Sequence, residues 1–270
     1  MSKEEISEFI FQNLLANKKE LKSQFLKNKK NIGFFYLDNL LPNELALNIF
    51  NKFPSLDETV KRKNLREKKY TAFQMDKYDS LLEKVIYAFQ DKKIVDLIAN
   101  ICDVNEVFAD EKLYAGGLSL MEKDNFLNPH LDNSHDKDRN RWRVLNILYY
   151  VTPDWKQEYG GNLEIWPNGL KEKQLTIKSA FNRLVVMATH QKSWHSVSKV
   201  LTDNIRCCIS NYYFSEKPLL ESDQFHVTTF RGNPSEKIKD KILQVDNFFR
   251  ATARKFFKKG VRENPHQYKK

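Results

Sequence analysis

The stretch NILYYVTPDWKQEYGGNLEIWPNG, residues 146–169, contains two short runs of β-branched and aromatic residues joined by a polar segment. Such runs are typical of β-strands, and the pair Gly160-Gly161 and the triplet at 167–169 are turn signals. Comparable runs lie on both sides of it, at residues 113–121, 173–177, 183–189 and 205–214. Because no helical pattern separates these runs, they predict an antiparallel β-sandwich or barrel.

Helices are expected before the strands. Residues 2–16 have an amphipathic pattern, and Ser2 and Glu5 have the spacing of a capping box. Further helical patterns occupy residues 43–53, 80–90 with Asp79 as the cap, and 93–104. We interpret the charged segment KRKNLREKK, residues 61–69, as an exposed connector between them.

A last helix is expected from about Ser235. Its apolar face is formed by Ile238, Ile242, Val245 and Phe249. The order of helices, strands and a final helix predicts an α+β protein with a mainly β core that is braced by helices at both ends.

We expect one structural domain made of three regions. Residues 1–108 form a mostly helical support, residues 109–230 form the β core, and residues 231–270 form the last helix and a basic tail. The chain length of 270 residues fits this organisation.

Charge and cysteine content narrow the class of protein. The net charge is +10, of which residues 250–270 contribute +7, and we interpret this basic tail as a solvated terminus. The three cysteines, Cys102 and the adjacent Cys207 and Cys208, form no disulfide framework, so a reducing, cytoplasmic location is expected. The N-terminus lacks the order of a signal peptide, and no apolar run reaches the length of a membrane span, so we expect no membrane association.

His130 and Asp132 form the only His-x-Asp pair in the chain. In a strand, residues two apart point to the same side, so both side chains could hold one metal ion. A third ligand is needed, and His195 is the best placed because it follows the strand-like run 183–189.

The other histidines are weaker candidates for this site, namely His135, His190, His226 and His266. His135 lies in a charged turn, His266 lies in the basic tail, and a lone histidine such as His190 is more often a core or rim residue. Two imidazoles and one carboxylate leave three octahedral positions open, which is typical of non-haem Fe(II) oxygenases. Zinc is not excluded, although it prefers closed tetrahedral sites.

Arg206 is the second candidate site residue. It begins the apolar strand-like run that follows the turn at 202–204. If it is buried, it needs an anionic partner, and the distal carboxylate of a small co-substrate would serve. The alternative is an ordinary surface arginine at the start of a strand.

Four segments resemble, in order and spacing, the 2-oxoglutarate- and Fe(II)-dependent dioxygenases of the prolyl-hydroxylase-like group. They are PHLDN at 129–133, the stretch 146–169, FNRLVVMATHQKSWHSV at 181–197 and IRCCISNYYF at 205–214. The resemblance covers about residues 110–216. It implies a double-stranded β-helix, also called a jelly roll, which agrees with the predicted strands.

The resemblance also implies a role for each matching residue. His130, Asp132 and His195 correspond to the iron ligands. Arg206 corresponds to the residue that pairs with the distal carboxylate of 2-oxoglutarate, and Tyr150 to a residue whose hydroxyl supports the same carboxylate. Many of these hydroxylases have a tyrosine before the metal strand where this chain has SLMEKDNFLNPH, residues 119–130, so specificity for a peptide is not implied.

The implied function is hydroxylation of an unactivated C–H bond, with Fe(II) as cofactor, 2-oxoglutarate and O2 as co-substrates, and ascorbate as an optional addition. The substrate class stays open between a prolyl or other protein residue and a small metabolite or saccharide. The alternative is a non-catalytic jelly-roll binding module with a basic surface, which the intact triad disfavours. A nucleic-acid partner is not favoured, and the sequence leaves the oligomeric state open.

Overall fold

The computed structural model describes residues 1–114, 116–257 and 268. The predicted basic tail therefore lies largely outside the described residues, as does His266. Within them the helices are α1 (Lys3–Ala16), α2 (Lys18–Asn28), α3 (Asn43–Asn51), α4 (Ser80–Ala88), α5 (Lys92–Cys102) and α6 (Lys237–Phe256). None of the described helices is both long and apolar enough to cross a membrane.

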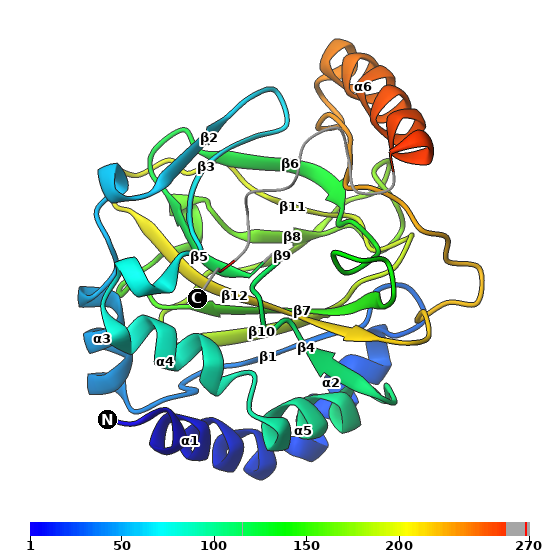
Figure 1. Cartoon of the computed structure of the whole chain (residues 1–270). Coiled ribbons are helices and arrows are strands. Elements are labelled where there is room, and N and C mark those ends of the chain that lie inside the picture. Colours follow the sequence, from blue (N-terminus) through cyan, green and yellow to red (C-terminus); the bar gives the residue numbers. More distant parts are fainter. Residues whose placement is uncertain (115, 258–267, 269–270) are drawn as a thin grey trace.

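The strands of the described chain pair into one curled antiparallel sheet (Figure 1). They are β1 (Phe34–Leu37), β2 (Val60–Lys63), β3 (Glu67–Ala72), β4 (Val107–Ala109), β5 (Gly117–Met121), β6 (Phe126–Leu131), β7 (Trp142–Tyr150), β8 (Leu163–Ile165), β9 (Leu175–Ile177), β10 (Arg183–Ala188), β11 (His195–Val197), β12 (Arg206–Ser215) and β13 (Thr229–Phe230). The order along the sheet is β1-β10-β7-β12-β5-β3-β6-β11-β8-β9.

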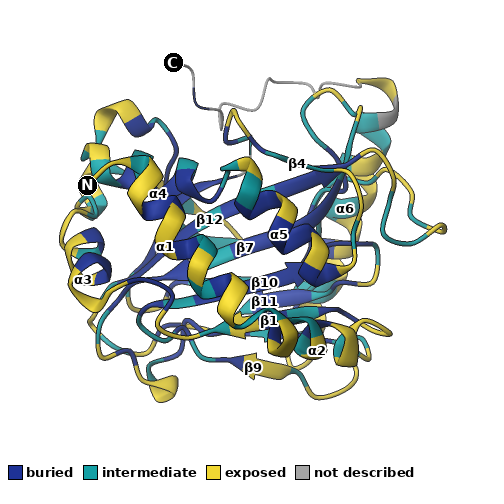
Figure 2. Ribbon diagram, turned by 90° about the horizontal axis from the view of Figure 1, so that it is seen from below, coloured by how far each residue is buried: buried dark blue, intermediate teal, exposed yellow. Residues whose placement is uncertain are grey.

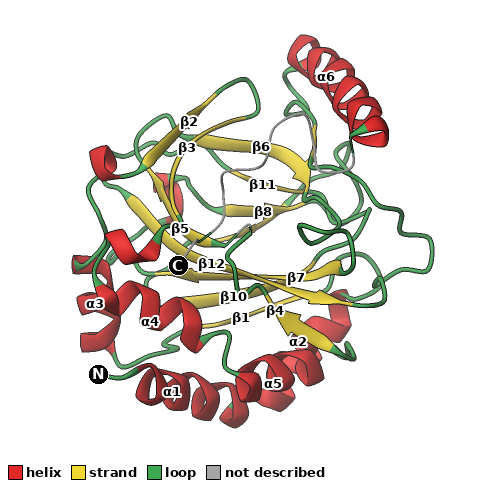
Figure 3. Ribbon diagram, in the orientation of Figure 1, coloured by secondary structure: helices red, strands yellow, loops and turns green. Residues whose placement is uncertain are grey.

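The sheet curls so that the end containing β6, β11 and β8 lies opposite the end containing β12, β7 and β10 (Figure 1). The N-terminal helices cover the outer face of the second end, with their buried sides toward the strands (Figures 2 and 3). This is the predicted α+β jelly roll with a mainly β core. The boundaries proposed at residues 108 and 230 stay a prediction.

The two tyrosines at the end of β7 show how this sheet is buried on both sides. Tyr149 packs against the helices, with its ring centroid 5.8 Å from that of Phe89. Tyr150 faces the interior of the barrel, in a separate apolar cluster with Leu163 and Val185. Both tyrosines are fully buried.

The capping box between Ser2 and Glu5 is confirmed. The interpretation of residues 61–69 as a connector is wrong, because they belong to the hairpin β2–β3, which pairs with β5 and β6. Charged residues suit these strands because side chains from both line a polar cavity and keep their charged ends in water. The charge pattern therefore conceals the strands.

Helix α6 forms as predicted, but its predicted apolar face is exposed. Ile238 is 80% exposed and Phe249 is 65% exposed. The opposite side of the helix carries the contacts: Leu243 is buried, and the Asn247 side chain donates to the main-chain oxygen of Phe230 and accepts from its N–H. Helix α6 is thus attached to β13 through polar groups and projects from the sheet (Figure 1).

Asn182, in the turn before β10, joins the N-terminal region to the barrel. Its backbone is left-handed, with φ of 57°, a conformation that asparagine tolerates. Its side-chain oxygen accepts from the Leu41 N–H at 3.0 Å and from the Tyr149 hydroxyl at 2.7 Å. Its amide nitrogen donates to the Leu41 carbonyl at 2.6 Å. All three residues are buried, so water cannot replace these bonds.

We expect Asn182→Ala to lower the free energy of unfolding by about 2–5 kcal/mol, because it leaves several buried polar groups without partners. Tyr149→Phe removes only one donor and should cost about 1 kcal/mol. Urea denaturation of both variants measures the difference. Equal losses in the two would show that Asn182 does not join the two regions.

Candidate metal centre

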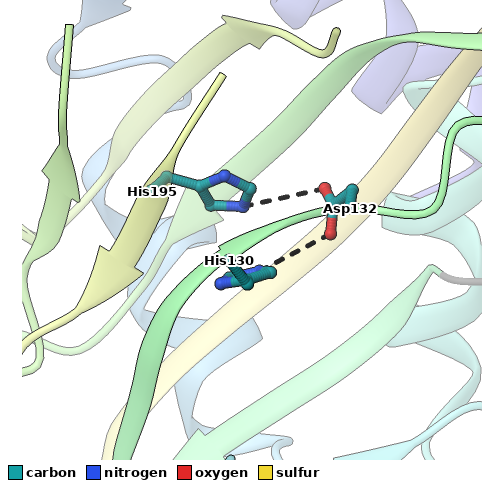
Figure 4. A group of neighbouring side chains, drawn as sticks. All are labelled: His130, Asp132 and His195. Atoms are coloured by element: carbon teal, nitrogen blue, oxygen red, sulfur yellow. Dashed lines mark ion pairs between the residues drawn. The ribbon is translucent and has the colours of Figure 1, made fainter. Parts of the chain in front are cut away.

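The pairing of β6 with β11 places His130 directly opposite His195. Asp132 follows β6 by one residue. Figure 4 shows the three side chains pointing toward one another. All three are buried, and one ligand atom from each lies within 4.8 Å of the others. The structure therefore brings together the three residues that the sequence selected.

Hydrogen bonds orient both imidazoles for metal binding. The Nδ1 atom of His130 lies 2.9 Å from the main-chain oxygen of Asn128, and that of His195 lies 2.9 Å from the oxygen of Ser193. A carbonyl oxygen only accepts, so each Nδ1 carries the proton and each Nε2 keeps its lone pair. The Nε2 atoms lie 3.6 Å and 3.7 Å from the Asp132 carboxylate oxygens.

The charges of the site suit a divalent cation. Burial opposes the charged form of Asp132, but the neighbouring His195, His130 and Arg143 outweigh burial and lower its pKa. Burial and the neighbouring His130 lower the pKa of His195 to about 4. At neutral pH the site thus offers a carboxylate and a neutral His195, and a metal displaces no proton from either.

The Asp132 carboxylate also has room for a further partner. Its Oδ2 atom is buried and accepts no hydrogen bond from the described residues. A metal ion held by His130, His195 and this carboxylate would satisfy it. Two histidines and one carboxylate are the donor set that non-haem Fe(II) uses, so these residues fit iron.

Arg206 is buried at the start of β12, which removes the alternative of a surface arginine. Its Nε donates to the Ser179 hydroxyl at 3.3 Å, and its guanidinium lies 4.9 Å from the ring centroid of Tyr150. No carboxylate of the described chain pairs with it, and the Tyr150 hydroxyl is buried without a partner. The two groups fit a carboxylate supplied by a co-substrate.

Gly161 explains how this arginine is accommodated. Its φ is 63°, and a Cβ atom at this position would lie 2.9 Å from Cδ of Arg206. The glycine pair that the sequence marks as a turn therefore also leaves space for the arginine side chain. Arg183, another cation in this part of the chain, pairs with Asp38 instead.

One cavity of about 920 Å³ reaches the triad and Arg206. His135, which the sequence places in a charged turn, also lines it and is buried. It is not part of the triad, and its burial has no signal in the sequence. His190 does not line the cavity, and its Nδ1 accepts from the Lys192 N–H at 3.1 Å.

The comparisons with known proteins agree with this geometry. The model of the 2OG-Fe(II) oxygenase superfamily, where 2OG denotes 2-oxoglutarate, matches residues 116–214. No curated protein matches the sequence.

Solved prolyl hydroxylases share the fold. A prolyl-4-hydroxylase of Pseudomonas putida is 14% identical, with 72% of this chain and 98% of that chain covered and a TM-score of 0.55. One of Phytophthora capsici is 17% identical, with 92% and 77% covered and a TM-score of 0.56. A prolyl hydroxylase of Trichoplax adhaerens, in complex with a hypoxia inducible factor peptide fragment, is 20% identical, with 78% and 96% covered and a TM-score of 0.50.

Over residues 116–214 the chain is thus similar to the 2OG-Fe(II) oxygenase superfamily. The name of that superfamily includes Fe(II) and 2-oxoglutarate, and the triad is a group of metal ligands that agrees with it.

We expect His130→Ala, Asp132→Ala and His195→Ala each to reduce bound iron from about one ion per chain to near none, because two ligands hold an open site poorly. Metal analysis of the purified variants, with circular dichroism to check folding, measures this.

His190→Ala serves as the matched control and should bind iron like the parent chain, because His190 does not line the cavity that contains the triad. We expect the same of His135→Ala. A folded His130, Asp132 or His195 variant that keeps its full iron content would remove that residue from the ligand set.

Proposed function

We propose that the chain is an Fe(II)- and 2-oxoglutarate-dependent dioxygenase that hydroxylates an unactivated C–H bond and releases succinate and CO2. One observation carries the proposal: the triad and the unpaired, buried Arg206 open into the same cavity. A protein that only bound a metal would have no use for a buried cation at that position. The superfamily match over residues 116–214 supports the same reading.

Bound iron supplies the oxidising chemistry with O2, and the chain supplies binding and orientation. Arg206 would hold the distal carboxylate of 2-oxoglutarate through two parallel hydrogen bonds, and the Tyr150 hydroxyl would donate a third. Burial raises the pKa of Tyr150 to about 12, against an opposing effect of Arg206, so its hydroxyl stays protonated and can donate.

The substrate would enter the remainder of the cavity. Its C–H bond belongs to a prolyl or other protein residue, or to a small metabolite or saccharide. Ascorbate would act as an optional reductant. The competing reading, a binding module without catalysis, has no feature of the cavity in its favour, because the three ligands and Arg206 are all present.

The central test is succinate formation from 2-oxoglutarate in the presence of Fe(II) and O2, which enzymes of this kind catalyse slowly even without substrate. We expect the parent chain to form succinate and His195→Ala to fall to the level of a protein-free mixture. If the parent chain binds 2-oxoglutarate but releases no succinate above that level, the binding module is the better description.

Arg206→Ala should keep its iron and weaken 2-oxoglutarate binding roughly 10- to 150-fold, which corresponds to the ~1.5–3 kcal/mol of a hydrogen bond to a charged group. Arg206→Lys should fall between, because an ammonium group cannot form both parallel bonds. Calorimetric titration with Mn(II) in place of iron measures the affinities. Parent-like affinity in Arg206→Ala would assign the carboxylate to another cation.

A further inference from the structure

The wall of the cavity beyond the metal centre is strongly basic. Seven arginine or lysine side chains line the whole cavity, against two carboxylates. Asp132, one of those carboxylates, belongs to the triad, and Glu67, the other, pairs with Lys69 at 3.0 Å. The cavity therefore keeps an excess of positive charge after its internal pairs are counted.

Part of this excess lies near His135, where Arg143 and Arg254 line the cavity. Arg139 lies next to Arg254 but does not line the cavity. These three arginines and His135 are called the arginine cluster below. Arg143 is the second residue of β7 and is 4% exposed. Its guanidinium lies 4.1 Å from the ring centroid of Tyr212. Arg254 comes from α6, and Arg139 donates to its main-chain oxygen at 3.3 Å. Residues far apart in the chain thus meet at one wall.

The arginine cluster has little compensating charge among the described residues. The Nε atoms of Arg139 and Arg143 are buried without hydrogen-bond partners, as is Nε2 of His135. Arg254 forms no side-chain hydrogen bond or ion pair with the rest of the described chain. The carboxylate that approaches Arg143 is Asp132, at 3.8 Å, and it is already committed to the metal centre.

The same arginines affect the ionisation of His135. Burial, followed by the charges of Arg139, Arg254 and Arg143, lowers its pKa to about 3. The ring is therefore neutral at physiological pH, and the cluster repels additional positive charge. By contrast, Arg250 of the same helix pairs with Asp246 at 2.9 Å, so unpaired arginines are not general on α6.

We infer that the arginine cluster binds a phosphate group carried by the substrate, so that the substrate of the proposed hydroxylation is a small phosphate ester. The inference rests on the proposed function. A phosphate monoester carries a charge near −2 and three acceptor oxygens, which suits several converging guanidinium groups better than a single carboxylate does. A cavity of about 920 Å³ accommodates a molecule of metabolite size beside 2-oxoglutarate.

The positions of these arginines also separate two binding regions within the cavity. Arg206 lies at the proposed co-substrate end, whereas Arg143 of β7 and Arg254 of α6 line another part of the cavity. A phosphate held there would orient the rest of the substrate toward the triad, which lines the same cavity. Fixing a substrate through a remote group is an established way to position its reacting bond.

Calorimetric titration of the full chain, loaded with Mn(II) and saturating 2-oxoglutarate, tests the inference. Saturation fills the Arg206 site, so any further anion must bind elsewhere. The probes are inorganic phosphate, a hexose phosphate, the corresponding neutral hexose, malonate and a phosphorylated peptide. We expect inorganic phosphate and hexose phosphate to bind, and hexose phosphate to bind most tightly of the five probes. The neutral hexose should not bind.

Arg254→Gln should weaken hexose phosphate binding roughly 10- to 150-fold, and Arg254→Lys should restore part of the loss. Lys241→Gln is the matched control, because Lys241 is an exposed residue of the same helix that does not line the cavity, and it removes the same charge. It should leave the affinity within about twofold, since exposed distant charges are screened.

Equal weakening in Lys241→Gln and Arg254→Gln would overturn the inference, since it would mean general charge attraction. Tighter binding of malonate would reject phosphate, and tighter binding of the phosphorylated peptide would reject a small molecule. Succinate formation separates the two proposals. Turnover without phosphate binding would reject this inference alone, whereas phosphate binding without turnover would reject the proposed oxygenase activity.

Discussion

The antiparallel pairing of β6 with β11 is the constraint on which the site depends. It sets His130 opposite His195, and the short reach to Asp132 then closes the triad. A shift of one residue in this pairing would turn one imidazole to the other face of the sheet, because side chains alternate along a strand. The rest of the barrel holds this register: β8 pairs with the far side of β11, and β3 and β13 pair with β6.

The site also requires a cavity that is shielded from water, in which a ligand rather than the protein completes the hydrogen bonds of the buried polar groups. Asp132, Tyr150 and Arg143 each have a buried polar atom without a partner in the described chain. Such atoms are costly in a folded protein. Asp132 and Arg143 line the cavity, so a ligand there could complete their hydrogen bonds. Asn182, at the junction with the N-terminal region, is bonded within the protein instead.

Short β-branched runs predicted β5, β7, β8, β9, β10 and β12, and the His-x-Asp pair pointed to the triad. The jelly roll followed from the family resemblance. The short strands β1, β4 and β13 were not predicted. The sequence also missed the hairpin β2–β3, since charged strands that line a cavity look like an exposed loop. It identified the apolar stripe of α6 but not its exposure, because periodicity reveals a face and not what covers it. The sequence could not predict the arginine cluster, because Arg143 and Arg254 come together only in the tertiary fold.

The residue at position 161 determines whether a barrel of this kind has space for an arginine at position 206. Gly161 contributes no atom to binding, yet its missing side chain is what gives Arg206 its space. If Arg206 holds 2-oxoglutarate as proposed, a related barrel with a bulky residue at this position could retain both histidines and the aspartate and still lose the co-substrate site. An inspection of the metal ligands alone would overlook this difference.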